Sequence, residues 1–126
     1  MPTSKPVILV VDDDPHMLNI MKRTLEMEGY PVIAIDSGER ALELLHQKRP
    51  GLVLLDIALP GIDGHETCRR IRKSSKVPVI MVSARDAPEE KSAAFAAGAD
   101  GYITKPFGAR ELTARVKAVL RRTGSA

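Results

Sequence analysis

Cysteine is almost absent from this chain of 126 residues, in which Cys68 is the only one. No disulfide can therefore form within the chain, and we expect a protein of a reducing compartment, the cytoplasm. Cys68 falls inside a helical pattern, where a free cysteine is most often a small buried hydrophobic residue.

Long apolar segments are missing as well. No run approaches the ~20 apolar residues that span a bilayer, and residues 1–6 are too short and too polar for a signal peptide. We therefore expect no membrane partner.

Aromatic residues make up only 3% of the sequence, and tryptophan does not occur. A core built from the remaining hydrophobic residues consists mainly of valine, isoleucine, leucine and alanine, which is typical of a parallel sheet covered by helices. The chain length fits one domain with one such core.

The net charge of +3 is modest. The basic residues gather in two places and are expected to be solvated helix faces: Arg69, Arg70, Arg72, Lys73, Lys76, Arg121 and Arg122. Without aromatic residues between them they do not form a nucleic-acid site, so we expect no direct nucleic-acid partner for this domain.

Apolar strand patterns alternate with helical patterns along the whole chain. The predicted strands are residues 7–11, 31–35, 52–55, 77–82 and 101–104. The predicted helices are residues 15–29, 37–47, 64–73, 88–97 and 109–122, and Ser37 is expected to cap the second of them. This alternation predicts an α/β fold: a doubly wound, five-stranded parallel sheet of flavodoxin-like order 2-1-3-4-5 with five helices.

Carboxylates follow two of the predicted strands. Asp12, Asp13 and Asp14 end the first strand, and Asp56 ends the third. Asp14 is expected to cap the helix that begins at Pro15. The carboxyl ends of parallel strands meet at one sheet edge, so the other three carboxylates are expected to form an acidic pocket there. Such a pocket needs a positive partner, and Mg²⁺ prefers hard oxygen ligands of this kind.

Two further strand ends add polar groups to the same edge. Ser83 follows the fourth strand and can hydrogen-bond an oxyanion, although a serine there, taken alone, is more often a turn residue. Lys105 follows the fifth strand and supplies a point charge, although taken alone it is equally a surface lysine. The sequence leaves open whether the bond from Lys105 to Pro106 is cis.

Together these motifs resemble the receiver domain of two-component response regulators over residues 6–122. The residues that carry the resemblance are Val10-Val11-Asp12-Asp13-Asp14-Pro15, Leu55-Asp56 with Pro60 and Asp63-Gly64, Val82-Ser83-Ala84, Gly98-Ala99-Asp100, Tyr102 and Lys105-Pro106-Phe107. Each motif alone is weak, whereas all of them in this order at strand ends are highly specific.

The resemblance implies that Asp56 accepts a phosphoryl group from a sensor histidine kinase or a small donor such as acetyl phosphate. It implies that Mg²⁺ (or Mn²⁺) is held directly by Asp13, Asp56 and the Ala58 carbonyl, with Asp12 acting through water. The protein would then be a phosphoacceptor and not an enzyme with turnover.

The resemblance also assigns the phosphate contacts and the switch. Lys105, the Ser83 hydroxyl and the backbone N–H groups of Ile57 and Ala84 are expected to bind the phosphoryl oxygens. Phosphorylation draws Ser83 inward and lets Tyr102 turn inward, which repacks the face made by the fourth helix, fifth strand and fifth helix. The alternative for Tyr102 is an ordinary half-buried strand aromatic.

Residues 102–107 and 111–122 resemble the OmpR/PhoB subclass, whose receivers carry a winged-helix DNA-binding domain. That likeness implies a phosphorylation-dependent homodimer with salt bridges from Lys91, Asp100, Glu111 and Arg115. Gly101 departs from it, because the subclass usually has a second aspartate there as the partner of Arg115. The alternative is a set of ordinary exposed helix charges.

We expect a receiver domain over residues 1–122 and a tail over residues 123–126 that begins a linker to an output domain. The alternative is a single-domain receiver that binds a partner or passes the phosphoryl group on in a relay. The three histidines, His16, His46 and His65, are expected at the surface.

Two rival classes fit the architecture less well. A magnesium-dependent phosphohydrolase with an aspartyl-phosphate intermediate usually has an Asp-x-Asp-x-Thr pattern, but Pro15 follows Asp14 here. A flavodoxin-like cofactor binder needs a hydroxyl-rich phosphate loop after the first strand, where this chain has three carboxylates that would repel phosphate.

Overall fold

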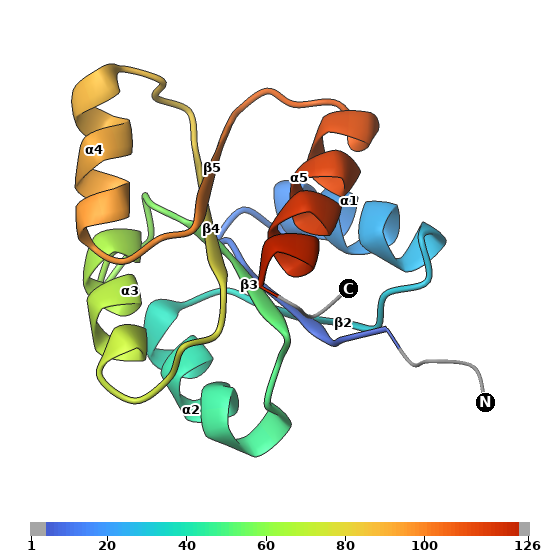
Figure 1. Cartoon of the computed structure of the whole chain (residues 1–126), viewed down its shortest axis with the longest axis horizontal. Helices are drawn as coiled ribbons and strands as arrows, with labels where there is room; N and C mark the ends of the chain where they lie inside the picture. The colour runs from blue at the N-terminus through green and yellow to red at the C-terminus, as the bar shows by residue number, and fades with distance from the viewer. Residues whose placement is uncertain (1–4, 124–126) are drawn as a thin grey trace.

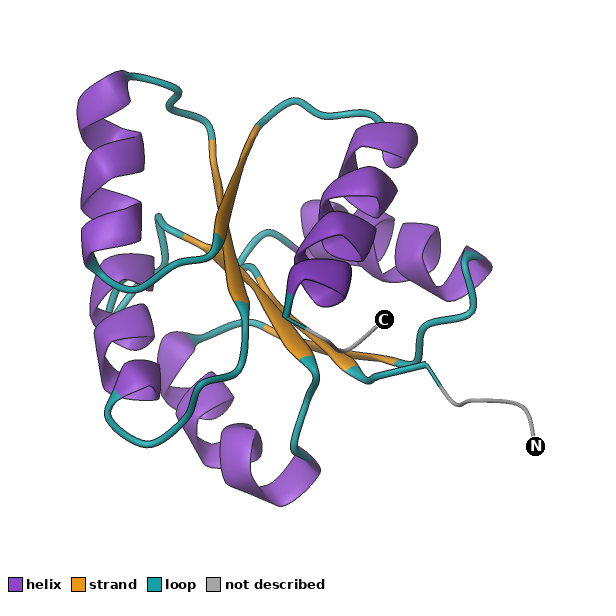
Figure 2. Ribbon diagram, in the orientation of Figure 1, coloured by secondary structure: helices purple, strands orange, loops and turns teal. Residues whose placement is uncertain are grey.

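The computed structural model describes residues 5–123 and consists of a central parallel sheet with helices on both faces (Figure 1, Figure 2). The strands are β1 (Ile8–Val11), β2 (Val32–Ile35), β3 (Leu52–Asp56), β4 (Val79–Ser83) and β5 (Gly101–Thr104). The helices are α1 (Pro15–Met27), α2 (Gly38–Lys48), α3 (Gly64–Arg72), α4 (Pro88–Ala96) and α5 (Ala109–Arg122). The strand order β2-β1-β3-β4-β5 confirms the predicted fold.

The sheet separates two hydrophobic clusters, because successive side chains of a strand point to opposite faces. Leu9 and Val11 of β1 pack into the cluster on the side of α2, α3 and α4, while Ile8 and Val10 pack into the cluster beneath α1 and α5. Figure 1 shows these two helix layers on either side of the strands. Both faces are covered, which explains why the strands are continuous apolar runs and do not alternate.

Side-chain caps fix where three of the helices begin. The Asp14 carboxylate accepts a hydrogen bond from the His16 N–H at 3.0 Å, and Ser37 Oγ accepts one from the Arg40 N–H at 3.1 Å. Both caps were predicted. Asp63 caps α3 in the same way through the Glu66 N–H at 2.9 Å, which the sequence reasoning had not identified. These caps place the first turns of α1 and α3 close to the carboxyl ends of β1 and β3.

The predicted start of β4 was wrong. The strand begins at Val79, two residues later than expected, because Val77 makes its hydrogen bonds elsewhere. Its carbonyl accepts from Arg72 Nη1 at 2.6 Å and its N–H donates to Ser75 Oγ at 3.0 Å. Arg72 is therefore a half-buried structural residue, which corrects its placement on a solvated face.

Helix α4 is the least anchored helix of the fold. It has no side-chain cap hydrogen bond at Ala87, and Ala94 is its only buried residue.

Cys68 lies fully buried on α3, as predicted. Within residues 5–123, no helix combines the length and apolar composition needed to cross a membrane. Of the predicted tail over residues 123–126, Thr123 forms the C-cap of α5, and residues 124–126 lie outside the described residues.

Candidate functional site

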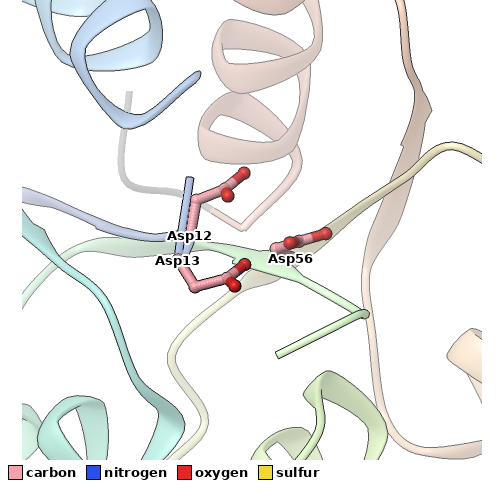
Figure 3. A group of neighbouring side chains, drawn as sticks. All are labelled: Asp12, Asp13 and Asp56. Atoms are coloured by element: carbon pink, nitrogen blue, oxygen red, sulfur yellow. The ribbon is translucent and has the colours of Figure 1, made fainter. Parts of the chain in front are cut away.

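Three carboxylates meet where the chain leaves the sheet at β1 and β3. Asp12 and Asp13 follow β1, and Asp56 is the last residue of β3 (Figure 3). One oxygen from each carboxylate lies within 4.8 Å of the others. Asp12 and Asp56 are buried and Asp13 is exposed, so the cluster opens to solvent on one side. The strand order reverses at β1 and β3, which is where ligand sites form in open α/β sheets.

Lys105 is the cation that this cluster contains. Its Nζ lies 3.0 Å from Asp12 Oδ2 and 3.5 Å from Asp56 Oδ1. The backbone directs it there, because Lys105 follows β5 and its N–H donates to the Ser83 carbonyl at 2.7 Å. The bond to Pro106 is cis. Asp12, Asp56 and Lys105 therefore meet although they stand at the ends of three different strands. In the sequence, Asp12 is 44 positions from Asp56 and 93 positions from Lys105.

The electrostatics of the cluster disfavour the ionised Asp56 side chain. Burial, followed by the charge of Asp12, raises the pKa of Asp56 above its ordinary value, although Lys105 and the Ala58 N–H oppose this shift. Burial lowers the pKa of Lys105, but the hydrogen bond to Asp12 and the charges of Asp56 and Asp12 outweigh it, so the pKa of Lys105 is raised. One ammonium therefore does not fully compensate the carboxylates.

The donor set fits a hard divalent cation. All three side chains offer carboxylate oxygens, and the excess negative charge would be balanced by such an ion. Asp12 is the most engaged of the three: Oδ1 accepts from the Asp14 N–H at 2.9 Å, and Oδ2 accepts from Lys105. Asp13 and Asp56 are better placed for direct ligation.

The predicted phosphate-binding groups lie at the same edge, with one difference. Ser83 is buried at the end of β4, next to Thr104 in the register, and its Oγ accepts from the Arg85 N–H at 3.1 Å. Ala84 follows it and is exposed. The Ile57 N–H, however, donates to the Val82 carbonyl at 3.0 Å and so belongs to the sheet. The Ile57 N–H is therefore already engaged where the prediction has it bind a phosphoryl oxygen, while a hydrogen bond from the Ala58 N–H lowers the pKa of Asp56.

Gly64 allows the α3 N-terminus to approach the carboxylate cluster. Its N–H donates to the Ile57 carbonyl at 2.8 Å. A Cβ atom at this position would lie 2.5 Å from the Asp56 carbonyl oxygen and 2.6 Å from Ile57 Cα. The Asp63-Gly64 pair therefore sets the loop that follows Asp56: one residue caps α3 and the next permits the close contact.

Tyr102 points inward in this structure. It is 6% exposed, and its hydroxyl donates to the Arg85 carbonyl at 2.6 Å. Arg85 therefore contacts both predicted switch residues, through its N–H to Ser83 and its carbonyl to Tyr102. Its guanidinium also lies 3.1 Å from Glu90 of α4. No sequence signal marks Arg85 for this position, because it contacts Ser83 and Tyr102 through its backbone N–H and carbonyl.

The residues predicted for a dimer face lie along α4, β5 and α5. Lys91, Glu111 and Arg115 are exposed. Asp100 differs from them, because its Oδ2 accepts from Arg72 Nη2 at 2.7 Å and from the Val79 N–H at 2.9 Å.

The histidines lie largely as expected. His16 and His46 are exposed, whereas His65 is half-buried and its Nδ1 is buried without a hydrogen-bond partner among the described residues. The expectation of a surface residue was therefore wrong for His65.

The fold and the acidic cluster define a class of α/β protein that has its site at the strand ends, and comparison with known proteins identifies the family. The response regulator receiver domain family matches residues 8–117. This chain belongs to that family.

Solved receiver structures agree with this assignment. The activated N-terminal receiver domain of Klebsiella pneumoniae RstA is 33% identical, with a TM-score of 0.86 over 91% of this chain and 98% of that one. A CheY-like receiver domain protein from Methanospirillum hungatei is 34% identical, with a TM-score of 0.86 over 94% and 96%. The receiver domain of a Francisella response regulator is 33% identical, with a TM-score of 0.87 over 94% and 99%.

Proposed function

We propose that this protein is a phosphorylation-activated receiver that takes a phosphoryl group on Asp56 from a sensor histidine kinase. The observation that carries the proposal is the Asp56 carboxylate at the end of β3, flanked by Asp12, Asp13 and the Lys105 ammonium. A phosphoacceptor site needs a carboxylate nucleophile next to groups that neutralise the oxygens of the transferring phosphoryl group. The family and the relatives support this assignment.

The transfer is an in-line displacement at phosphorus. An oxygen of the Asp56 carboxylate forms the new P–O bond while the P–N bond of the donor phosphohistidine breaks, and the electron pair leaves with the imidazole. Lys105, whose Nζ lies 3.5 Å from Asp56 Oδ1, pairs with one phosphoryl oxygen, and the hydroxyl of the buried Ser83 donates a hydrogen bond to another. Mg²⁺ held by Asp13, Asp56 and the Ala58 carbonyl, with Asp12 acting through water, would neutralise charge on that phosphoryl group.

The output is a shift of the face made by α4, β5 and α5. Ser83 Oγ already accepts from the Arg85 N–H and can still donate its own proton to a phosphoryl oxygen. Arg85 connects this contact to Tyr102 and to α4. The weakly anchored α4 is the element most easily biased between two positions. This face then controls homodimerisation or the binding of a partner, and through an output domain, transcription.

Phosphorylation by acetyl phosphate tests the proposal. We expect one phosphoryl group per chain by intact mass when Mg²⁺ is present, and none after chelation. Asp56→Asn is the matched control, since it keeps the size of the side chain and removes the nucleophile. Labelling of Asp56→Asn to the same extent as the natural chain would contradict the proposal, as would repeated turnover of a phosphomonoester.

The oligomeric state tests the output. Light scattering with Mg²⁺ and the phosphoryl mimic beryllofluoride should show a change in mass if the face dimerises. Asp56→Asn should show none. A monomer under both conditions would leave partner binding as the output of this receiver.

A further inference from the structure

The loop from β3 to α3 is held at its middle by a side chain of α2. This loop covers residues 57–63 and contains the Ala58 carbonyl, the backbone ligand of the proposed metal site. The Glu39 carboxylate, in the first turn of α2, accepts a hydrogen bond from the Ile62 N–H at 3.2 Å. Within residues 5–123, this is the one hydrogen bond that joins residues 60–62 to another helix or strand.

The two ends of the loop are anchored separately. Near β3, the Leu59 side chain is buried in the core, and its N–H donates to the Ile57 carbonyl at 3.0 Å. Near α3, the Gly64 N–H donates to that same carbonyl at 2.8 Å, and Asp63 caps the helix. These bonds lie within the loop or at its end, so Glu39 supplies the contact that fixes its middle from outside.

Two glycines allow α2 to lie directly against the loop. Gly61 has a φ of +73°, and a Cβ there would lie 2.6 Å from Glu39 Oε2. A Cβ at Gly38 would lie 3.0 Å from Ile62 Cγ1 and nearer still to Thr67 Oγ1. The Glu39 carboxylate therefore packs on the loop backbone itself, in space that a side chain at residue 61 would fill.

An acidic residue in the first turn of a helix also has a purely local role, because it lies at the positive end of the helix dipole. That role needs a charge and no partner in the loop. The Ile62 N–H needs only an acceptor oxygen, which glutamine provides without the charge. The two roles therefore predict different behaviour of a Glu39→Gln variant.

We propose that Glu39 is a positioning residue of the phosphoacceptor site. It holds the loop of residues 57–63 so that the Ala58 carbonyl is in place when a divalent cation binds at the acidic cluster. The inference rests on the proposed function and deepens it by giving the site a support on α2. A cation that takes the Ala58 carbonyl binds only chains whose loop is in position, so a loop that samples other positions lowers the apparent affinity in proportion.

Metal binding without phosphorylation tests this directly. The probe is Mn²⁺ alone, whose free concentration is followed by electron paramagnetic resonance on titration with the whole chain. Glu39→Ala should weaken Mn²⁺ binding about fivefold, the factor that one hydrogen bond contributes, whereas Glu39→Gln should stay within about twofold of the natural chain. Glu43→Ala removes an exposed glutamate one turn further along α2 and should leave the affinity unchanged.

The coupling to the loop needs its own variant. Gly61→Ala places a methyl group against the Glu39 carboxylate and also strains a backbone with a φ of +73°. Glu39→Ala removes the clash but not the strain. The double variant should therefore bind Mn²⁺ more tightly than the product of the two single losses predicts. A simple product of the two losses would overturn the proposed contact.

Two further results would overturn the inference: Mn²⁺ binding by Glu39→Ala as tight as that of the natural chain, or an equal loss in Glu39→Gln and Glu39→Ala. Urea denaturation in a chelator establishes that every variant is folded under the titration conditions.

Labelling of Asp56 by acetyl phosphate is measured in parallel by intact mass. Labelling of the natural chain together with unchanged Mn²⁺ binding by Glu39→Ala would reject the role of Glu39 and leave the proposed function standing. Weakened Mn²⁺ binding by Glu39→Ala without any labelling of the natural chain would reject the proposed function alone.

Discussion

The Arg72 guanidinium on α3 lies 2.7 Å from Asp100 Oδ2, in the turn between α4 and β5. The same side chain donates to the Gly98 carbonyl at 3.0 Å and to the Val77 carbonyl at 2.6 Å. On the other side, Arg122 Nη2 donates to the Asp100 carbonyl at 2.7 Å. Asp100 therefore joins the C-terminal ends of α3 and α5 and fixes the turn that follows α4. The N-terminal end of α4 has no side-chain cap.

Replacing Arg72 by alanine should destabilise the fold. The change removes the donor to three backbone carbonyls and the cation beside the half-buried Asp100 carboxylate, which we expect to lower the free energy of unfolding by about 2 kcal/mol. Urea denaturation measures this. Arg121→Ala, an exposed cation on α5, should change stability by less than about 0.5 kcal/mol. Equal effects of the two substitutions would show that the Arg72 bonds contribute nothing.

The raised pKa of Asp56 predicts a pH-dependent stability. Burial first, and the charge of Asp12 second, make the folded state bind this proton more tightly than the unfolded state, whose pKa is near 3.8. The resulting contribution is fully present below that pH and is lost as pH rises through the folded-state pKa. The Asp56→Asn variant has no ionisable group at this position, so its free energy of unfolding does not include this loss as pH rises.

Urea denaturation in the presence of a chelator, from about pH 4 to about pH 8, compares the natural chain with Asp56→Asn. The asparagine variant should gain in relative stability as pH rises. Mg²⁺ should then stabilise the natural chain more than the variant, since an ion that binds only the folded state shifts the equilibrium toward it. A constant difference across the pH range would contradict the assignment.

Gly64→Ala should affect both stability and phosphorylation. The added Cβ would lie 2.5 Å from the Asp56 carbonyl oxygen, so the loop after β3 or the first turn of α3 must move. We expect a loss of about 2 kcal/mol in the free energy of unfolding and slower labelling of Asp56 by acetyl phosphate. Gly108→Ala meets no atom within 4 Å and provides the matched control. Normal labelling of a fully stable Gly64→Ala variant would argue against this tight contact.

Tyr102→Phe removes only the hydroxyl that donates to the Arg85 carbonyl. Loss of one hydrogen bond with a partly buried acceptor should lower the free energy of unfolding by about 1 kcal/mol. If the Tyr102 ring stays inward in both states, the loss of stability should be the same with and without beryllofluoride. If the ring points outward without beryllofluoride, the loss should be seen only when beryllofluoride is present. Thermal unfolding under both conditions separates these cases, and no effect in either would exclude a role for this bond.

Much of the fold could be predicted because local signals agree with the final packing. The alternation of apolar runs and helical patterns predicted all five strands and five helices, and Asp14 and Ser37 marked helix starts correctly. The strand ends also predicted the acidic cluster, because parallel strands carry their C-terminal residues to one edge. The predicted start of β4 was wrong because the Val77 carbonyl accepts a hydrogen bond from Arg72 of α3, and no local pattern in the sequence indicates this contact.

The order of residues along the chain indicates which groups can act at this site: carboxylates, a hydroxyl and an ammonium directly after apolar strands. It does so because strand direction and sheet order follow from local pattern and connection rules. How these groups are engaged depends on the folded arrangement. Lys105 lies close to both Asp12 and Asp56, the Ile57 N–H belongs to the sheet, and Arg72 pairs with Asp100. These contacts join residues distant in the chain, and no local pattern specifies which of several possible donors reaches a given acceptor.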